Sequence, residues 1–193
     1  KKRIARGGMA EVFLGEDQLL GRPVAVKVLF PEFASDPNFV ERFRREAQAA
    51  ANLSHPNIVG VFDWGKERNT YYIVMEYVEG RTLSQIIRKE GPLPAARVVE
   101  VADAMASAVG FAHKGNVVHR DMKPGNVIIS DTGQIKVADF GIATAISTGS
   151  EADLTQAGAV MGTANYFSPE QAQGLNVDGR SDLYSLGVVM YEM

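Results

Sequence analysis

A carboxylate and an amide lie five residues apart in residues 119–126, His-Arg-Asp-Met-Lys-Pro-Gly-Asn. Apolar runs at residues 117–118 and 127–129 flank this stretch, so we expect buried strands to hold both ends of a loop. Asp121 can orient an attacking hydroxyl, and Asn126 can ligate a metal ion. Phosphoryl transfer needs these two functions and little covalent chemistry from the protein. The loop therefore predicts phosphoryl transfer.

A lysine inside an apolar strand is the second candidate for chemistry. The run Val24-Ala25-Val26 leads into Lys27, and an unpaired buried ammonium costs free energy, so this position needs a reason. Binding the α- and β-phosphates of a nucleotide, beside a carboxylate, provides one. Glu46, next to Ala47 at the border of a buried helix face, is the candidate carboxylate. The alternatives are a solvent-facing Lys27 on an edge strand and a surface ion pair between Glu46 and Arg42.

Another carboxylate, in Asp139-Phe140-Gly141, follows Asp121 by 18 residues, after two short expected strands. It can bind a Mg²⁺ ion that bridges phosphate oxygens. Small residues also gather at residues 4–12, where backbone N–H groups can approach phosphate oxygens. Against the pattern G-x-G-x-x-G-x-V only the middle glycine and the valine match, so an ordinary hairpin turn is an equal alternative.

The elements that must position these residues change character along the chain. The pattern in the first part of the sequence predicts strands around one helix that begins at Asp36, and the pattern in the second part is mainly helical. We expect an α+β fold with two lobes, residues 1–80 and 81–193, hinged near Gly80. The expected strands are residues 11–15, 23–29, 58–62, 71–77, 127–129 and 134–137, and the expected helices begin at residues 36, 82, 94 and 183.

Composition limits the remaining classes of function. The chain has 193 residues and a net charge of −3, which gives no reason to expect nucleic acid as a partner. Cysteine is absent, which excludes disulfides and thiolate metal sites and fits a cytoplasmic location. No apolar run is long enough to span a bilayer. We interpret His55 as a helix terminator, His113 as a surface helix residue and His119 as a packing residue.

The sequence motifs described above, in this order, resemble those of the eukaryotic-like serine/threonine protein kinases. The resemblance covers nearly the whole chain and is greatest to the bacterial branch, which includes the membrane-anchored receptor kinases of actinobacteria. The motifs that favour this branch lie at residues 7–12, 41–47 and 162–172. Relative to the family pattern, the glycine loop has Ala5 and Ala10 where the outer glycines are expected.

The resemblance implies ATP and Mg²⁺ (or Mn²⁺) as cofactors and proteins with serine or threonine as substrates. Asp121 would accept the substrate proton, Lys123 would neutralise the γ-phosphate, and Lys27 would hold phosphates while paired with Glu46. Asn126 and Asp139 would ligate the metal. The residues implied for nucleotide binding are Ile4, Ala5, Arg6, Gly7, Gly8, Met9, Ala10, Glu11, Val12, Ala25, Lys27, Met75 as gatekeeper, Glu76, Val78 and Ile128.

The resemblance also implies a regulated loop between Gly141 and Ser168. Thr155 aligns with the threonine that such kinases autophosphorylate, and Arg120 is a natural cation for that phosphate. Thr163 would face the substrate. Asp182 would brace the catalytic loop from the final helix.

The family pattern further predicts that this chain is a fragment, cut in its first strand and in its final helix. Glu170 would then lack its arginine partner, and the isolated chain would be only marginally stable.

Two other interpretations remain beside an active kinase. A pseudokinase or ATP-binding signalling scaffold is disfavoured because Lys27, Asp121, Asn126 and Asp139 are all present. A dinucleotide-binding domain would need its glycine pattern to open a helix, whereas a strand follows here. We also expect a homodimer of kinase domains as a candidate assembly, no membrane segment in this chain, and a cytoplasmic kinase domain whose parent chain is a candidate for membrane anchoring.

Overall fold

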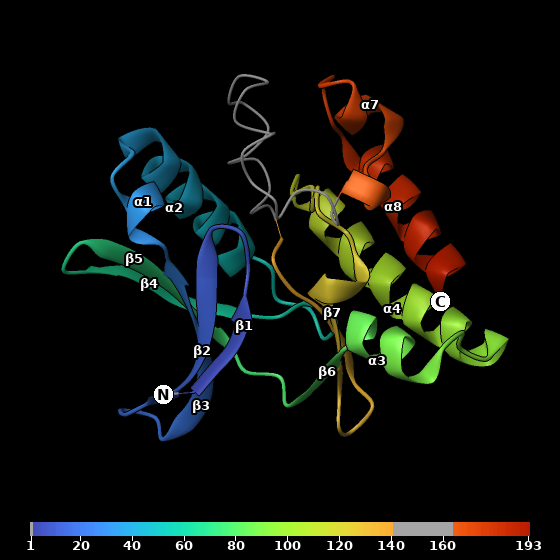
Figure 1. Cartoon of the computed structure of the whole chain (residues 1–193), viewed down its shortest axis with the longest axis horizontal. Coiled ribbons are helices and arrows are strands. Elements are labelled where there is room, and N and C mark those ends of the chain that lie inside the picture. The colour runs from blue at the N-terminus through green and yellow to red at the C-terminus, as the bar shows by residue number, and fades with distance from the viewer. Residues whose placement is uncertain (1, 141–163) are drawn as a thin grey trace.

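The computed structural model describes residues 2–140 and 164–193, with Asn38, Arg42 and Glu46 described by their backbone only. An antiparallel sheet with two helices beside it forms the first part of the molecule, and a helical part with a small sheet follows (Figure 1). The expected α+β fold is therefore confirmed. No helix in the described ranges has both the length and the apolar character needed to cross a bilayer.

Five strands form the larger sheet in the order β1-β2-β3-β5-β4. They are β1 (Lys2–Arg6), β2 (Ala10–Asp17), β3 (Arg22–Leu29), β4 (Val61–Glu67) and β5 (Thr70–Glu76). All neighbours are antiparallel, and Val26 of the central strand β3 lies between Phe13 and Val74. The alternating burial of β3 follows from this place, since one face of the sheet is covered and the other is not.

Helices α1 (Pro31–Ala34) and α2 (Pro37–Ala51) lie beside this sheet. Asp36 caps α2 as predicted, because its carboxylate accepts a hydrogen bond from the N–H of Phe39 at 3.4 Å. Phe39, Phe43 and Ala47 recur at helical spacing and pack with strand residues in the first core. The helix ends at Ala51, before the expected terminator at residues 55–56.

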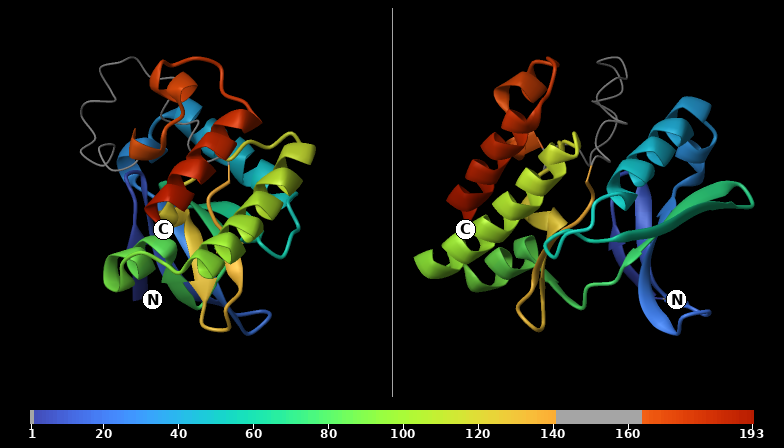
Figure 2. Two further views of the ribbon diagram at one scale, coloured as in Figure 1. Left: turned by 90° about the vertical axis from the view of Figure 1, so that its right-hand side faces the viewer. Right: turned by 180° about the vertical axis from the view of Figure 1, so that it is seen from behind.

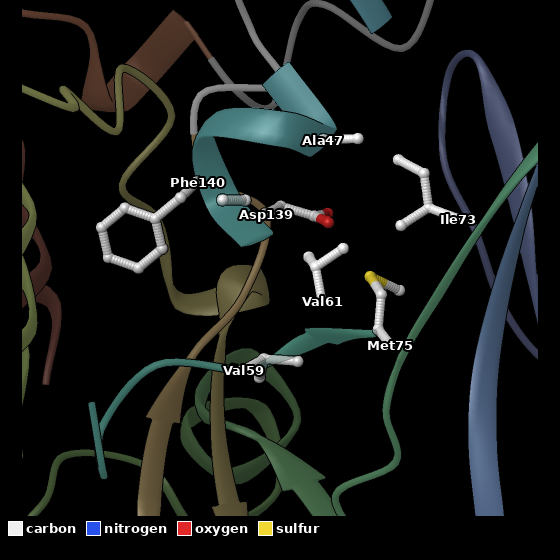
Figure 3. A pocket seen from close by; sticks show the side chains of 8 residues that line it. Ala47, Val59, Val61, Ile73, Met75, Asp139 and Phe140 are labelled. Carbon is white, nitrogen blue, oxygen red and sulfur yellow. The ribbon is translucent and has the colours of Figure 1, made fainter. Parts of the chain in front are cut away.

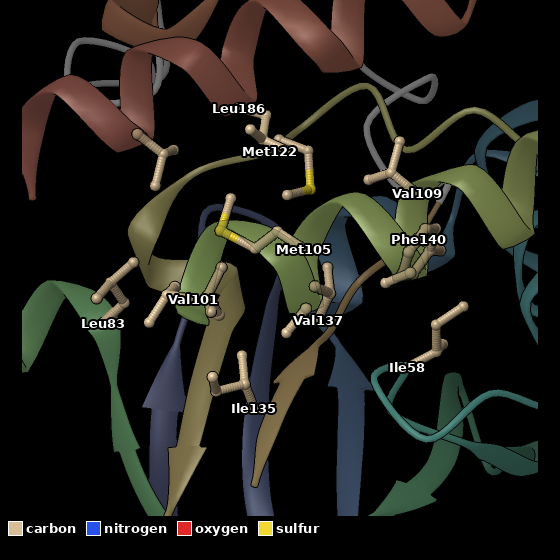
Figure 4. Close-up of a cluster of buried hydrophobic side chains, with 14 of the residues drawn as sticks. Ile58, Leu83, Val101, Met105, Val109, Met122, Ile135, Val137, Phe140 and Leu186 are labelled. Atoms are coloured by element: carbon tan, nitrogen blue, oxygen red, sulfur yellow. The ribbon is translucent and has the colours of Figure 1, made fainter. Parts of the chain in front are cut away.

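The second part combines helices with the sheet β6-β7-β8. Its elements are β6 (Gly80–Thr82), α3 (Leu83–Glu90), α4 (Ala95–Lys114), η1 (Pro124–Asn126), β7 (Val127–Ser130), β8 (Ile135–Val137), η3 (Ala164–Tyr166), α7 (Pro169–Ala172) and α8 (Gly179–Glu192). Val101, Met105 and Val109 line one face of α4 and pack in one core with residues of β7 and β8, which follow the loop at residues 119–126 (Figure 4). The strand expected before that loop, at residues 117–118, does not form; Val117 packs against the same core instead, so the core still holds both ends of the loop.

A short segment, residues 57–60, ties the two parts together (Figure 2). The N–H of Val59 donates to the carbonyl of Val137 at 2.9 Å, and the N–H of Val137 donates to the carbonyl of Asn57 at 2.8 Å. Ile58 belongs to the second core and Val59 to the first. The strand expected at residues 58–62 therefore begins three residues later, at Val61, because residues 57–59 bond to β8 instead.

Lys136 adds an ion pair to this connection. Its ammonium lies 2.9 Å from Oε1 of Glu76 at the end of β5, and the residue is 7% exposed. Oε2 of Glu76 also accepts a hydrogen bond from the N–H of Gly60 at 3.1 Å. The end of β5 is therefore held by both the crossing segment and the second sheet.

Gly80 pairs with Ser130 where the chain enters the second sheet. A Cβ atom at this position would lie 2.2 Å from the carbonyl oxygen of Ile129 and 2.6 Å from the Cα of Ser130. Both atoms belong to the backbone, so they cannot move aside as a flexible side chain would. The glycine is required here for close approach of two strands.

We expect Gly80→Ala to destabilise the protein by about 2–3 kcal/mol, because the added methyl group forces β6 and β7 apart. Urea unfolding of the variant and the parent measures this difference. Gly110→Ala is the matched control, since nothing lies within 4 Å of the added Cβ in α4. That change should leave the stability unchanged or raise it by up to about 1 kcal/mol. Equal stability of the Gly80→Ala variant and the parent would contradict the close approach.

Candidate active site

Asp121 lies in the loop between α4 and η1, with one carboxylate oxygen held by two neighbours. Lys123 Nζ lies 2.7 Å from Asp121 Oδ2, and Asn126 Nδ2 donates to the same oxygen at 3.1 Å. Asn126 Nδ2 also donates to the carbonyl of Asp121 at 2.8 Å. These bonds fix the rotamer of Asp121, and among the described residues they go to Oδ2 and not to Oδ1.

Asp182 of α8 holds the backbone of this loop through its buried carboxylate. Oδ2 accepts a hydrogen bond from the N–H of His119 at 2.8 Å, and Oδ1 accepts one from the N–H of Arg120 at 2.7 Å. His113 Nε2 lies 2.7 Å from Oδ2. Asp182 is 1% exposed, and a buried carboxylate needs such donors because its desolvation is costly.

The prediction for His113 as a surface helix residue is wrong. Its side chain is 24% exposed and turns toward Asp182, and a Cβ atom on Gly179 would lie 2.7 Å from the ring. The start of α8 therefore packs directly on the imidazole. The helical pattern of α4 could not identify this contact, because its partners lie more than 60 residues later.

His119 joins the loop to the residues that precede Asp139. The N–H of Asp121 donates to His119 Nδ1 at 3.2 Å, so Nδ1 is an acceptor and Nε2 carries the proton that is donated to the carbonyl of Ala138 at 3.0 Å. The ring is fully buried and meets Phe140 edge-on, with 4.6 Å between ring centroids. This geometry fits the expected packing role.

Lys27 of β3 and Asp139 come together across the site. Lys27 Nζ lies 2.9 Å from Asp139 Oδ1, and the lysine side chain is 9% exposed. Burial alone would raise the pKa of Asp139, but the charge and hydrogen bond of Lys27, helped by the charge of Lys123, outweigh burial and lower it. Asp139 therefore remains a carboxylate well below neutral pH.

Asp139 points into a narrow gap between α2 and the sheet (Figure 3). The gap has a volume of about 10 Å³, room for about one water molecule, and its wall includes Ala47, Ile73 and Met75. Glu46 lies next to Ala47 in α2, but its side chain is outside the described residues. Its pairing with Lys27 stays a prediction.

The residues expected around a nucleotide base share one apolar cluster. Ala25 of β3 and Met75 of β5 are buried in it, and Val12, Val78 and Ile128 pack against it from β2, the connection after β5, and β7. Side chains from both parts of the molecule thus meet in one apolar cluster. Glu76, beside Met75, has its side chain committed to Lys136.

The expected glycine loop, residues 4–12, forms a hairpin turn between β1 and β2. Ile4, Ala5 and Arg6 end β1, and Ala10, Glu11 and Val12 begin β2. Between them, the N–H of Gly7 donates to the carbonyl of Ala10 at 2.8 Å, and the carbonyl of Met9 accepts from the N–H of Phe30 at 2.9 Å. Gly8 occupies the tip. The turn therefore rests against the chain that follows β3, at the end of the strand that carries Lys27.

Two side-chain oxygen atoms suited to a magnesium ion lie on neighbouring segments of the chain, one on Asn126 and one on Asp139. The N–H of Ala138, next to Asp139, donates to the carbonyl of Asn126 at 2.8 Å. Asn126 uses its amide nitrogen for Asp121 and Asp139 uses Oδ1 for Lys27, which leaves Asn126 Oδ1 and Asp139 Oδ2. Within the described ranges no group of three His, Cys, Asp or Glu side chains forms a metal cage. Two oxygens suit Mg²⁺, which takes its other ligands from phosphates and water.

Thr155, Thr163 and Gly141 lie outside the described residues. Glu170, expected to lack an arginine, accepts a hydrogen bond from the hydroxyl of Ser181 in α8, which lowers the pKa of Glu170. Gln171 is a functional candidate that the sequence did not predict; its side-chain amide donates to the carbonyl of Arg120 at 2.8 Å. The spacing S-x-x-Q from Ser168, typical of a helix capping box, was the available signal.

We expect Asp182→Asn to destabilise the protein by about 2–4 kcal/mol, because the amide nitrogen would face a backbone N–H where a carboxylate oxygen now accepts. Thermal unfolding followed by circular dichroism measures the loss. Asp103→Asn, an exposed change in α4 with the same charge difference, is the control and should stay within about 0.5 kcal/mol of the parent. A similar small effect for both variants would show that the carboxylate does not hold the loop.

Comparison with known proteins agrees with this geometry. The whole chain, residues 1–193, matches the protein kinase domain family. It is 48% identical over 190 residues to the serine/threonine-protein kinase PrkC of Bacillus subtilis, covering 98% of this chain and 29% of PrkC. It is 52% identical over 191 residues to the serine/threonine-protein kinase PknB of Mycobacterium tuberculosis, covering 97% of this chain and 30% of PknB.

A solved structure, the kinase domain of PknI from Mycobacterium tuberculosis, superposes with a TM-score of 0.79 at 34% identity. That comparison covers 98% of this chain and 69% of the solved chain. The chain spans about three tenths of the length of these curated relatives. The chain has the protein kinase fold and belongs to the protein kinase domain family, with bacterial serine/threonine kinases as its relatives.

Proposed function

We propose that this chain is the phosphotransferase part of a serine/threonine kinase, which transfers the γ-phosphate of ATP to hydroxyls of protein substrates. One observation carries the proposal. Lys27 is bonded to Asp139, 112 residues later, Asp121 is bonded to Asn126, and the hydrogen bond from the N–H of Ala138 to the carbonyl of Asn126 joins the two pairs. This is the set of charges and ligands that phosphoryl transfer needs.

Asp121 is the residue that we assign to the substrate hydroxyl. Lys123 and Asn126 hold its Oδ2, so Oδ1 would orient the hydroxyl and accept its proton as the new bond to phosphorus forms. Lys123 would neutralise charge on the γ-phosphate from the same side. The relatives' names as serine/threonine kinases support this choice of acceptor.

Lys27 would bind the α- and β-phosphates. In the structure its ammonium is paired with Asp139, and we propose that Glu46 becomes its partner when Asp139 turns to the metal. Asn126 Oδ1 and Asp139 Oδ2 would hold Mg²⁺, or Mn²⁺, which when bound neutralises the phosphate oxygens. Backbone N–H groups of the turn at residues 7–9 would cover the phosphates.

The adenine ring would bind at the apolar cluster that both parts of the molecule form. Val12 and Ala25 would cover one face and Ile128 the other, with Met75 at the back. Backbone groups of Glu76 and Val78 would bond the ring edge. The Lys136–Glu76 ion pair supports this role, because it fixes the end of β5 without using the backbone carbonyl of Glu76.

Regulation and context complete the proposal. Thr155 would be an autophosphorylation site, with Thr163 close to the substrate. Two kinase domains could pair so that each phosphorylates the other, and the domain would act in the cytoplasm.

The test is intact mass after incubation with Mg-ATP. The samples are this chain, a version extended to the length of the solved kinase domains, and the extended Asp121→Asn variant. We expect added phosphate, mapped to Thr155, on the extended parent, and a rate roughly 10²- to 10⁴-fold lower in the variant, because it loses the proton acceptor. Asp131→Asn, an exposed change in the turn between β7 and β8, should not alter the rate.

The contrary result is equally clear. A folded, ATP-binding chain that gains no phosphate in any form, and phosphorylates no added protein, would favour the ATP-binding scaffold over the enzyme.

A further inference from the structure

Gln171 connects a helix cap to the catalytic loop. It lies in α7, where its Oε1 accepts a hydrogen bond from the N–H of Ser168 at 3.0 Å. Its Nε2 donates to the carbonyl of Arg120 at 2.8 Å, 51 residues away in sequence. One side chain therefore completes the capping box of α7 and reaches the residue that precedes Asp121.

The orientation of this amide is determined by its two neighbours. The N–H of Ser168 can only donate and the carbonyl of Arg120 can only accept. Turning the amide over would place two donors together and two acceptors together. The amide of Gln171 therefore supplies both the acceptor and the donor that this position needs. Glutamate supplies only the acceptor, and an apolar side chain supplies neither.

The carbonyl that Gln171 binds belongs to the peptide bond between Arg120 and Asp121. The N–H of the same peptide donates to His119 Nδ1 at 3.2 Å. A peptide unit is planar, so these two hydrogen bonds on opposite edges fix its rotation. The Cα of Asp121 is part of this plane, which sets the direction in which its carboxylate leaves the backbone.

This peptide follows a residue with an unfavourable backbone conformation. Arg120 has φ of 66°, in the left-handed region that residues other than glycine seldom adopt. Such a conformation persists only when its surroundings hold it. Asp182 holds the N–H of Arg120 and Gln171 holds its carbonyl, so the strained residue is fixed from α8 on one side and from α7 on the other.

We propose that Gln171 is a positioning residue for catalysis: its side-chain N–H holds the Arg120–Asp121 peptide so that the Asp121 carboxylate faces the substrate hydroxyl. The proposal rests on the proposed phosphotransferase function, since it assigns the support of the same carboxylate. It does not place Gln171 in contact with ATP or substrate. The effect should therefore fall on the chemical step and not on nucleotide binding.

Gln171→Glu separates the two roles of the side chain. A carboxylate can still accept from the N–H of Ser168 and suits the start of a helix, so the cap remains. The second oxygen would face the carbonyl of Arg120, where a donor is required. We expect kcat of the extended kinase to fall about tenfold, the KM for ATP to stay within about twofold, and the melting temperature to change by less than about 2 °C.

Two further variants complete the set. Gln171→Met removes both halves of the amide, so both kcat and the melting temperature should fall. Gln173→Glu makes the same charge change at an exposed position two residues later, and all three measured quantities should stay at the parent values. An unchanged kcat in Gln171→Glu, with an active parent, would overturn the proposal.

Hydrogen exchange gives a readout that does not depend on activity. In Gln171→Glu the amide of Asp121 should exchange at least about tenfold faster than in the parent, while the amide of Gln171 in α7 stays protected. Unchanged exchange at Asp121 would overturn the proposal even if the parent proved inactive. Absence of phosphotransfer in the parent would instead refute the proposed function, so the two failures are distinct.

Discussion

The buried carboxylate of Asp182 is the interaction on which the catalytic loop depends. A charge that is 1% exposed is tolerated only when donors replace the lost water, and here two backbone N–H groups and an imidazole do so. Those N–H groups belong to His119 and Arg120. The requirement of the carboxylate for donors and the requirement of the loop for a fixed backbone are therefore met by the same bonds. Helix α8 consequently sets the backbone of the loop that carries Asp121.

The geometry around Asp121 is imposed from outside the loop. Arg120 and Asp139 both have left-handed backbones, with φ of 66° and 64°. The residue before each is hydrogen-bonded to another part of the chain, His119 to Asp182 and Ala138 to Asn126. His119 joins the loop to the carbonyl of Ala138, which lies beside Asp139. Strain at these two positions is held by hydrogen bonds between elements and not by local sequence preference. The backbone on either side of the site thus depends on contacts between elements that are distant in the sequence.

Local patterns in the sequence predicted the elements that depend on local forces. Helix α4 was expected to begin at residue 94 and begins at Ala95, and the cap at Asp36 is present. Strand β6 was missed because its three residues are stabilised by β7, about 50 residues later. The contact of His113 with Asp182 was missed for the same reason. Lys27 was correctly expected to need a carboxylate; the described partner is Asp139, and the expected pairing with Glu46 stays a prediction.

The pairing of Lys27 with Asp139 also has a consequence for the order in which the chain matures. The two residues are 112 positions apart, so a ribosome adding about 5–20 residues per second needs roughly 6–20 seconds to bring the aspartate after the lysine. All five strands of the larger sheet have been made well before then. During that interval Lys27 lacks the partner that it has in the complete structure. This ion pair between the two parts can therefore form only after most of the second sheet has been made, so it adds to the stability of the first part late.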